Sequence, residues 1–386
     1  SRYVGGLFER IPEGAAWLES VDELQPRPLE ALLDEARATV DRHADDVDAA
    51  AKALRTARRR EVLRLALAGI LDVITVQQLG RGLADVTTAL LTGTLSLCHR
   101  FGDGIEFAII AMGRYGGAEL GFGSDADVMY VYRDAGAGDD AQKRAERIVH
   151  ELKRLTEDLR LPLDLDIDLR PEGRNGAIVR SLDSYRAYYE RWSLTWEAQA
   201  LLRARAVAGD SALMTDFTTL ADTVRYPAAF GEAEAREVRR IKARVESERL
   251  PQAADPARHL KLGRGSLSDV EWFVQLLQLQ HAAAHPSLAT TSTLDALQAT
   301  VDAELVPPGD AERLRAAWLI ASRARSALTL WSAKTGDVLP LDRAQLEGVA
   351  RLMGYPAGGA SRLEEDYLRT TRLARHVFER WFYGTT

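Results

Sequence analysis

Residues 107–132, FAIIAMGRYGGAELGFGSDADVMYVY, decide the fold that the sequence predicts. A short apolar run, 107–112, opens this segment and a second one, 128–132, closes it, and each run has the length and composition of a buried strand. The glycine-rich residues 113–123 lie between the two runs, where the backbone must come close to another group. The segment therefore predicts two strands joined by a tight loop, at the centre of a small α/β unit.

Two aspartates stand at the start of the second predicted strand. Asp125 and Asp127 are two residues apart, so both side chains leave the same face of an extended chain. Carboxylates this close repel each other unless a cation lies between them, and their hard oxygen atoms suit Mg²⁺, which also takes ligands from substrate phosphates. The pair therefore predicts a metal site for in-line displacement at phosphorus, with two metal ions bound to the attacking and the leaving oxygen.

Two further features add to this predicted site. Main-chain N–H groups of the glycine loop and the hydroxyl of Ser124 can bind phosphate oxygens. Residues 163–170, LDLDIDLR, alternate between apolar and charged side chains, which predicts a strand with one apolar and one charged face. If this strand lies in the same sheet, several carboxylates converge on one spot. The order of strand, glycine loop, aspartate pair, strand, helix and acidic strand favours a phosphoryl-transfer site over a chance cluster.

Most of the remaining sequence predicts helices. Residues 28–99 contain no proline after the first position, which is typical of helical sequence. A helix capped by Asp139 or Asp140 is expected to run to about Arg160, with Leu159 on its apolar face. Helical sequence resumes beyond Ser181 and continues almost to Thr386. The expected breaks in this last part are Pro251, Pro286, Pro307, Pro308 and residues 354–359.

These elements predict an α+β fold that is mostly helical. The expected parts are an N-terminal helical segment over residues 1–100, an α/β core over 101–180 and a C-terminal helical bundle over 181–386. The chain of 386 residues is long enough for two or three domains.

Composition excludes several classes of partner. The formal net charge of −7 and the lack of a basic, aromatic-rich strand face argue against nucleic acid. The longest apolar stretches are far shorter than the ~20 residues that span a bilayer, and no signal peptide opens the chain, so no membrane association is predicted. Cys98 is the only cysteine, so no internal disulfide is possible and a cytoplasmic location is predicted.

Motifs of competing enzyme classes are absent from the sequence. The chain has no Gly-Lys-Ser/Thr of a P-loop, no dinucleotide-binding fingerprint and no Gly-x-Ser-x-Gly elbow. It opens with Ser1 in place of methionine, which is expected of a piece cut from a longer protein.

Residues 112–127, MGRYGGAELGFGSDAD, closely resemble the signature of the glutamine synthetase adenylyltransferases. That family's pattern is a glycine, a basic residue and Leu-Gly-Gly-x-Glu-Leu, followed by Ser-Ser-Asp, a hydrophobic residue and Asp. Tyr115 and Gly123 depart from the pattern, and Ala126 is smaller than usual, but both carboxylates are kept. Residues 165–173, LDIDLRPEG, are similar to the family's Val-Asp-x-Arg-Leu-Arg-Pro-x-Gly, with Asp168 in place of an arginine.

The resemblance covers nearly the whole chain and implies a polymerase-β-like nucleotidyltransferase core between helical segments. Members of the family carry two such units in tandem: one removes AMP from glutamine synthetase by phosphorolysis, and the other adds AMP to a tyrosine. Residues 195–201, TWEAQAL, and Gly121 favour the adenylylating, C-terminal half, whereas Met112 favours the other half. The implied reaction is therefore transfer of AMP from ATP to a tyrosine hydroxyl of glutamine synthetase, with release of pyrophosphate.

Two alternatives stay open on the sequence. One is phosphorolytic de-adenylylation of the modified synthetase, and the other is a non-catalytic module that binds nucleotide or a PII-type signalling protein. The partners that the resemblance implies are glutamine synthetase, a PII-type protein and the second catalytic half of a longer chain, in the regulation of nitrogen metabolism.

The resemblance also implies roles for individual residues. Asp125 and Asp127 bind both Mg²⁺ ions, and Asp166 binds the catalytic ion and helps to deprotonate the attacking tyrosine, whose free pKa of about 10 makes it a weak nucleophile. The expected phosphate-binding residues are Gly116, Gly117 and Ser124 in the loop, with Arg170, Arg203, Arg205 and Lys261 as cations that either neutralise phosphate charge or pair with nearby acids such as Glu197, Asp269 and Glu271.

Overall fold

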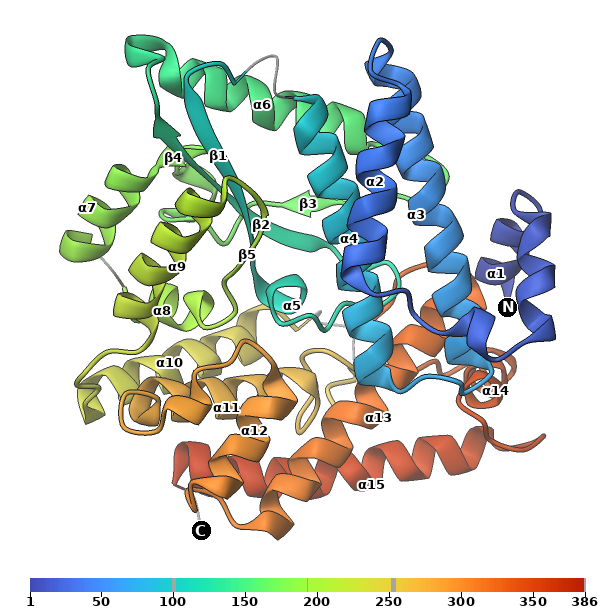
Figure 1. Ribbon diagram of the computed structural model, residues 1–386. Helices are drawn as coiled ribbons and strands as arrows, with labels where there is room; N and C mark the ends of the chain where they lie inside the picture. The colour runs from blue at the N-terminus through green and yellow to red at the C-terminus, as the bar shows by residue number, and fades with distance from the viewer. Residues whose placement is uncertain (99–101, 193, 251–254, 385–386) are drawn as a thin grey trace. The chain divides into compact units, whose positions relative to one another are not determined.

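The computed structural model describes residues 1–98, 102–192, 194–250 and 255–384 (Figure 1). The chain divides into two compact units. The sheet unit comprises Leu7–Val224, and the helical unit comprises Ser1–Gly6 together with Arg225–Thr386. The boundary between Gly6 of the helical unit and Leu7 of the sheet unit lies within helix α1, Arg2–Phe8.

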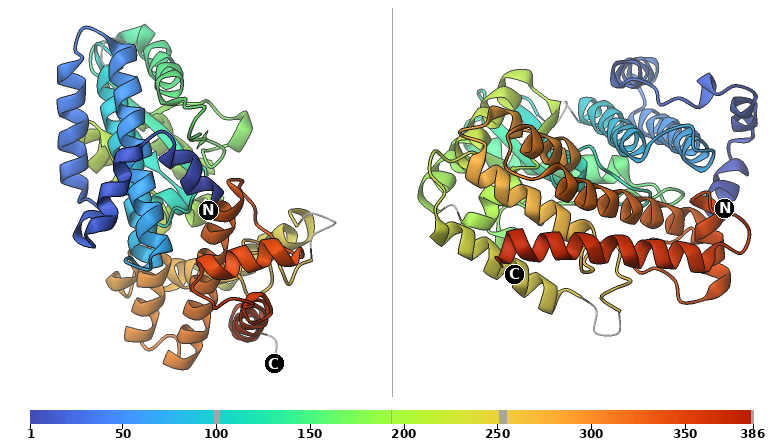
Figure 2. Two further views of the ribbon diagram at one scale, coloured as in Figure 1. Left: turned by 90° about the vertical axis from the view of Figure 1, so that its right-hand side faces the viewer. Right: turned by 90° about the horizontal axis from the view of Figure 1, so that it is seen from below.

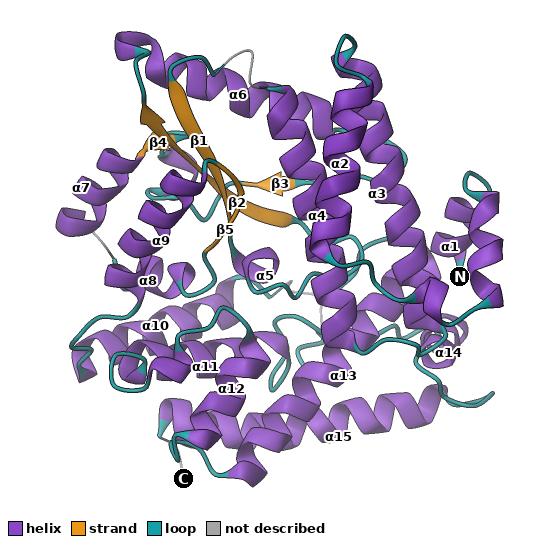
Figure 3. Cartoon of the chain, in the orientation of Figure 1, coloured by secondary structure: helices purple, strands orange, loops and turns teal. Residues whose placement is uncertain are grey.

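The sheet unit contains a mixed sheet of five strands within the described residues (Figure 3). Its order is β3-β2-β1-β5, and β4 also pairs with β2. Strand β1 runs antiparallel to β2 and β5, whereas β3 and β4 run parallel to β2. The strands are β1 (Ile105–Ala111), β2 (Ala126–Asp134), β3 (Leu165–Asp166), β4 (Arg180–Ser181) and β5 (Arg205–Gly209).

Helices cover this sheet and form a bundle beside it. Helix α4 packs against α2, α3, α6 and β5, and both views of Figure 2 show α2, α3 and α4 lying alongside one another. The longer helices of the sheet unit are α2 (Leu29–Arg42), α3 (Val47–Ile70), α4 (Val76–Leu97), α6 (Ala141–Thr156), α7 (Leu182–Trp192) and α9 (Ser211–Arg225). The short ones are η1 (Pro12–Glu19), η2 (Asp22–Leu24), α5 (Gly113–Gly116), η4 (Gly138–Asp140), η5 (Gly173–Asn175) and α8 (Thr195–Leu201).

Local sequence explains where the bundle helices begin. Asp46 caps α3 by accepting a hydrogen bond from the Ala49 N–H at 2.9 Å. Thr75 and Gln78 form a reciprocal capping box at the start of α4. Such caps satisfy N–H groups that have no partner inside the helix, so each helix starts at a defined residue.

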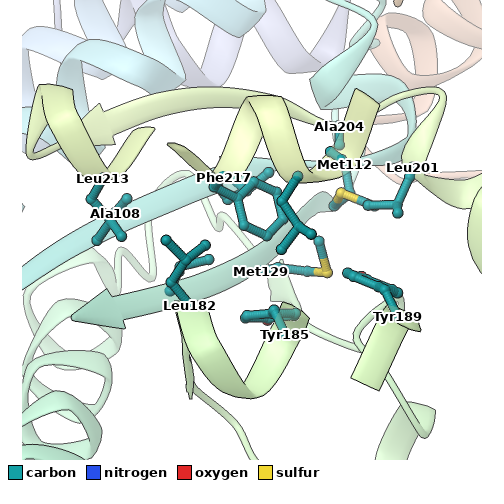
Figure 4. Close-up of a cluster of buried hydrophobic side chains, with 14 residues drawn as sticks. Ala108, Met112, Met129, Leu182, Tyr185, Tyr189, Leu201, Ala204, Leu213 and Phe217 are labelled. Atoms are coloured by element: carbon teal, nitrogen blue, oxygen red, sulfur yellow. The ribbon is translucent and has the colours of Figure 1, made fainter. Parts of the chain in front are cut away.

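The core on one face of the sheet joins strands and helices from distant parts of the sequence (Figure 4). Met129 of β2 and Ala108 of β1 pack there against Tyr185 of α7 and Phe217 of α9. The rings of Tyr185 and Phe217 meet edge to face, with centroids 5.4 Å apart, a favoured aromatic geometry. Helices α7, α8 and α9 therefore belong to the sheet unit, because their apolar faces are buried against the sheet.

The helical unit is built from helices alone, apart from a single bridge between His259 and Val338 within the described residues. Its helices are α10 (Glu232–Glu248), α11 (Leu267–His281), η6 (Pro286–Leu288), α12 (Thr293–Asp302), α13 (Pro308–Ser332), α14 (Arg343–Leu352), α15 (Ala360–Phe378) and the π-helical turn η7 (Glu379–Tyr383). Lys242 is fully buried in this unit and its Nζ lies 2.7 Å from Asp269 Oδ1, so the buried charge is compensated.

The structure confirms an α+β fold that is mostly helical. The apolar runs at 107–112 and 128–132 lie in or directly beside β1 and β2, as predicted. Among the predicted breaks, Pro286 opens η6, Pro308 opens α13, and residues 354–359 separate α14 from α15. His99, at the end of the predicted helical stretch, and the predicted break at Pro251 lie outside the described residues.

Four expectations about elements were wrong. The strand expected at 163–170 is reduced to Leu165–Asp166, because the chain turns directly after Asp166. Helix α6 ends at Thr156, and Leu159 is 90% exposed. Asp140 precedes α6 but makes no side-chain capping hydrogen bond. Helical sequence was expected beyond Ser181, yet residues 205–209 form β5.

The boundary between the two units also lies inside a predicted segment. The sequence places residues 181–386 in one C-terminal bundle, whereas the compact units separate at Val224 and Arg225. The division into three parts stays a prediction about domains. Among the described residues, none of the helices combines the length and apolar character that crossing a bilayer requires.

Candidate functional site

Parallel pairing of β2 with β3 brings two of the predicted carboxylates together. Asp127 and Asp166 are direct partners in the register of these strands, and the Ala126 N–H donates to the Asp164 carbonyl at 2.8 Å. Partners in neighbouring strands project from the same face, on backbones about 5 Å apart. Asp127 is half-buried, and Asp125, directly before β2, is exposed. All three predicted carboxylates therefore lie on one end of two adjacent strands.

Gly113 allows the backbone to lie against the Asp127 side chain. The Met112 N–H donates to the Asp127 carbonyl at 2.8 Å, which joins the end of β1 to the start of β2. Gly113 follows with a φ of +50°, and a Cβ at this position would overlap Oδ2 of Asp127. A left-handed backbone and a close approach both require glycine. A glycine at residue 113 therefore leaves room for the Asp127 carboxylate.

The two glycines predicted to bind phosphate have their N–H groups engaged inside α5. The Gly116 N–H donates to the Met112 carbonyl at 2.7 Å, and the Gly117 N–H donates to the Gly113 carbonyl at 3.1 Å. A Cβ on Gly116 would overlap the Arg203 carbonyl oxygen. Close packing of α5 against the chain before β5 therefore explains why residue 116 is glycine.

Ser124 closes a turn in the same loop. Its Oγ accepts a hydrogen bond from the Gly121 N–H at 3.1 Å, and its own N–H donates to the Gly121 carbonyl at 3.1 Å. These bonds fix Ser124 directly before Asp125.

Two of the predicted phosphate-binding arginines hold the glycine loop in place. Arg203 is buried and its Nη2 lies 2.5 Å from Oε2 of buried Glu119. Arg205 donates from Nε to the Gly116 carbonyl at 3.0 Å and from Nη2 to the Tyr115 carbonyl at 3.2 Å. The last carbonyls of a helix have no partner inside it, so Arg205 caps the carboxyl end of α5.

A third arginine, Arg170, organises the loop that follows β3. Its buried guanidinium donates to three backbone carbonyls: Ile167 at 2.7 Å, Arg174 at 3.1 Å and Gly176 at 3.1 Å. The sequence assigned Arg170 to the charged face of a strand, but the side chain is turned inward. The sequence had left pairing with an acid such as Glu197 as the alternative to phosphate binding, whereas these three hydrogen bonds go to backbone carbonyls, and the carboxylate of Asp168 lies 3.9 Å from Nη1.

The acidic residues of this loop form local contacts. Oδ1 of Asp166 accepts a hydrogen bond from the Asp168 N–H at 2.7 Å, which bends the chain after β3. Asp168 binds Arg174, with 2.6 Å between Oδ2 and Nε. This hydrogen bond raises the pKa of the Arg174 guanidinium, and the charges of Asp168 and Asp166 add to the effect.

Buried Glu197 connects the same loop to α7 and α8. Its Oε1 accepts a hydrogen bond from the Tyr188 hydroxyl at 2.8 Å, and its Oε2 accepts from the Leu194 N–H at 2.9 Å. Burial raises the pKa of Glu197, against the opposing effect of these hydrogen bonds and of one from the Glu172 backbone. Glu197 had been named only as a partner for nearby cations.

Lys261 is the one predicted site residue outside the sheet unit. It is exposed and belongs to the helical unit, in the segment before α11. Its backbone carbonyl accepts a hydrogen bond from the Ser268 N–H at 2.9 Å. A role for Lys261 at the phosphates stays a prediction.

Sequence reasoning missed three residues of the site. Gly113 lay in the glycine cluster, but only the structure shows which glycine meets a carboxylate. Glu119 and Arg174 are single charges in a loop, with no spacing that marks them. Their partners are 84 and 6 residues away in sequence, and folding alone brings the first pair together.

The donor set fits Mg²⁺ by its chemistry. Across residues 1–98, 102–192, 194–250 and 255–384, no three His, Cys, Asp or Glu side chains converge as a group that could hold a metal ion. Mg²⁺ does not need such a cage, because it is commonly bound by one or two carboxylates plus waters and substrate phosphates. The adjacent carboxylates of Asp127 and Asp166, with Asp125 beside them, are hard oxygen donors of this kind.

Comparison with known proteins identifies the family. The model of the glutamate-ammonia ligase adenylyltransferase family matches residues 1–220, and that of the GlnD PII-uridylyltransferase family matches residues 235–382. The chain belongs to the glutamate-ammonia ligase adenylyltransferase family.

Curated relatives carry the same description. A protein of Leifsonia xyli subsp. xyli is 66% identical over 388 residues, which cover 100% of this chain and 38% of the relative. A protein of Streptomyces avermitilis is 44% identical, over 99% of this chain and 41% of the relative, and one of Mycobacterium avium is 48% identical, over 89% and 36%. Each is named a bifunctional glutamine synthetase adenylyltransferase/adenylyl-removing enzyme. The chain thus spans about two fifths of the length of these relatives.

Proposed function

We propose that this chain is a Mg²⁺-dependent nucleotidyltransferase that moves AMP from ATP to a tyrosine hydroxyl of glutamine synthetase and releases pyrophosphate. The observation that carries the proposal is the direct pairing of Asp127 with Asp166 across β2 and β3, with Gly113 clearing the space around the Asp127 carboxylate. The sheet and its glycine loop support a polymerase-β-like core, and membership of the adenylyltransferase family supports the substrates.

Asp125, Asp127 and Asp166 would hold two Mg²⁺ ions. When bound, the ions supply positive charge that offsets the charge of the phosphates and of the developing oxyanions. The Asp166 carboxylate lies on the strand next to Asp127, so it is placed to accept the proton of the attacking tyrosine hydroxyl. That hydroxyl has a free pKa of about 10, and removal of its proton produces a stronger nucleophile for attack on the α-phosphorus.

The remaining predicted residues divide into two roles. We assign Ser124 to the triphosphate, because its turn places the hydroxyl next to Asp125. Gly116 and Gly117 shape the loop through α5, while Arg203, just before β5, and Arg205, the first residue of β5, hold that loop. Ser124 would therefore bind phosphate, whereas Arg203 and Arg205 would affect catalysis only through the position of the loop.

The same carboxylates would serve removal of AMP, in which inorganic phosphate takes the AMP group from the tyrosine and leaves as ADP. Curated relatives are named as both adenylyltransferases and adenylyl-removing enzymes, so phosphorolysis of the AMP-tyrosine bond is the second candidate function. A PII-type signalling protein is a proposed partner, supported by the match of residues 235–382 to the PII-uridylyltransferase family model. The second catalytic half of a longer chain and a cytoplasmic location belong to the same proposal.

The direction of AMP transfer tests this function. Unmodified glutamine synthetase, Mg²⁺ and ATP labelled on the α-phosphate are mixed with the protein, and the label on the synthetase is measured. Adenylylation predicts that the label appears on a tyrosine of the synthetase. Phosphate-dependent release of ADP from pre-modified synthetase, without any labelling, would instead assign the chain to de-adenylylation.

A further inference from the structure

The loop after β3 has an unusually constrained backbone. Glu172 adopts a left-handed φ of +63°, and Gly173 follows with a φ of +56°. A Cβ on Gly176 would overlap the Pro171 carbonyl oxygen. A non-glycine residue in the left-handed region carries a strain cost, and such conformations cluster at functional sites. This loop therefore holds one conformation that local preference alone would not select.

Buried Arg170 fixes the backbone position of Arg174 in this loop. Its Nη2 donates to the Arg174 carbonyl at 3.1 Å, and its Nε and Nη1 hold the carbonyls of Gly176 and Ile167 on either side. Residue 174 thus has a defined place relative to β3. Six residues separate it from Asp168, which lies just beyond the proposed metal ligand Asp166.

The Arg174 side chain pairs with Asp168 although it faces solvent. Its Nε lies 2.6 Å from Asp168 Oδ2, while the side chain is 86% exposed. The partner Asp168 is itself bonded to the proposed metal ligand, because its N–H donates to Asp166 Oδ1 at 2.7 Å. Within the part of the chain that the structure describes, Nη1 and Nη2 have no protein acceptor.

An exposed ion pair of this kind contributes little to stability. The stability gained from the pair with Asp168 therefore does not explain why the Arg174 guanidinium is held in this position. A planar guanidinium with two unused nitrogens is the group best suited to bind two oxygens of one phosphate.

We propose that Arg174 is a phosphate-binding residue of the nucleotide site, held in place by Asp168 and by the Arg170 clamp. Its terminal nitrogens would donate to phosphate oxygens of a nucleoside triphosphate whose metal ions are bound by the adjacent carboxylates. This inference rests on the proposed function, because it assumes that the carboxylates of β2 and β3 hold a metal-bound nucleotide.

The test removes the guanidinium from residue 174 and introduces one at residue 168. Nε of Arg174 is bonded to the carboxylate of residue 168, so an arginine at 168 would return a guanidinium to nearly the same place. Four proteins are compared: the parent, Arg174→Ala, the double variant Asp168→Arg/Arg174→Ala, and Arg37→Ala. Arg37 is the matched control, because it is also exposed and also pairs with an aspartate, Asp34 on α2.

Two measurements are made on each protein: Mg-ATP binding by titration calorimetry, and the ATP dependence of AMP transfer. Arg174→Ala is expected to weaken ATP binding and raise the KM for ATP by about tenfold, with an unchanged unfolding temperature. The double variant is expected to recover most of this loss, and Arg37→Ala to behave like the parent.

The outcomes separate the two proposals. ATP binding and KM at the parental level in Arg174→Ala overturn the role of Arg174, and so does a loss that the double variant fails to recover. A parent that binds Mg-ATP with an Arg174-dependent affinity but transfers no AMP in either direction would contradict the proposed function while supporting the phosphate-binding role.

Discussion

At the scale of the residue, Gly113 links backbone geometry to the position of Asp127, a proposed catalytic carboxylate. Its left-handed φ and its contact with Asp127 are separate requirements. Gly138 has a similar φ of +59° with nothing near its missing Cβ. Replacing each by alanine should cost about 1–2 kcal/mol of stability through the backbone alone.

Only Gly113→Ala is expected to abolish AMP transfer, because its new methyl group displaces the Asp127 carboxylate. Transfer rates and thermal unfolding of Gly113→Ala and Gly138→Ala, measured side by side, check this. Equal rates for the two variants would show that the contact with Asp127 has no catalytic consequence.

The residues themselves differ in how far the sequence predicted them. A period of two places Asp125 and Asp127 on one face, and in the structure Asp127 lies at the start of β2 with Asp125 directly before the strand. Arg170, Arg203 and Arg205 were named as cations that either neutralise phosphate charge or pair with nearby acids, because a sequence shows a charge without its partner. Their acceptors are carbonyls and a carboxylate that tertiary packing brings into reach.

At the scale of the element, the Arg203–Glu119 pair joins the chain before β5 to the glycine loop. Both side chains are buried, so removing one charge leaves the other uncompensated. Glu119→Gln should therefore lower the free energy of unfolding by about 3–5 kcal/mol. The control is Glu106→Gln, which breaks a partly exposed pair with Arg133 and should cost under about 1 kcal/mol. Denaturant unfolding measures both, and comparable losses would contradict the structural role of the buried pair.

Glu197, at the junction of α7, α8 and the β3 loop, makes the free energy of unfolding depend on pH. Burial raises its pKa above the ordinary value of 4.5, so the folded protein binds this proton more tightly than the unfolded chain. The stability from this group is then present below pH 4.5 and is lost as the pH rises through the folded pKa.

The Glu197→Gln variant does not lose stability in this way, because glutamine has no carboxyl group to ionise. The free energy of unfolding of the variant minus that of the parent should therefore increase between about pH 4 and about pH 7. Urea unfolding at several pH values measures this difference. A difference that stays constant or decreases would show that the hydrogen bonds of Glu197, and not its burial, dominate.

Two elements show why element boundaries escaped prediction. The alternating pattern at 163–170 predicts a strand, but the hydrogen bond from the Asp168 N–H to Asp166 ends it after two residues. Residues 205–209, RAVAG, carry no strong strand pattern, and pairing with β1 makes them a strand. In both cases a specific contact overrides local preference.

At the scale of the whole molecule, the three proposed metal ligands all belong to the sheet unit. A fragment of residues 7–224 contains its own sheet and apolar core. It should unfold cooperatively by itself and bind Mg-ATP, because no metal ligand is removed. Circular dichroism and calorimetry on the fragment check both points, and a fragment without a cooperative transition would contradict the division into units.

The same fragment examines the prediction for Lys261. If that lysine contacts the phosphates, the fragment should bind Mg-ATP more weakly than the whole chain, and Lys261→Ala in the whole chain should show the same weakening. Equal affinity in all three proteins would remove Lys261 from the nucleotide site.

The fold class could be predicted from the sequence because helical patterns are long and the strands β1 and β2 are strongly apolar. The unit boundary at Val224 and Arg225 could not, since α9 reads as helix like its neighbours and only its packing on the sheet assigns it. The family signature likewise implied a chemistry for the site, but not the order of its strands.

The most direct measurement of the central claim compares the parent with Asp127→Asn for transfer of labelled AMP to glutamine synthetase in the presence of Mg²⁺. Asparagine keeps the size of the side chain and removes its charge, so the unfolding temperature should change little. If Asp127 holds the metal ions with Asp125 and Asp166, the variant transfers no detectable label. A variant of near-parental rate would contradict the assignment of these carboxylates as the catalytic metal site.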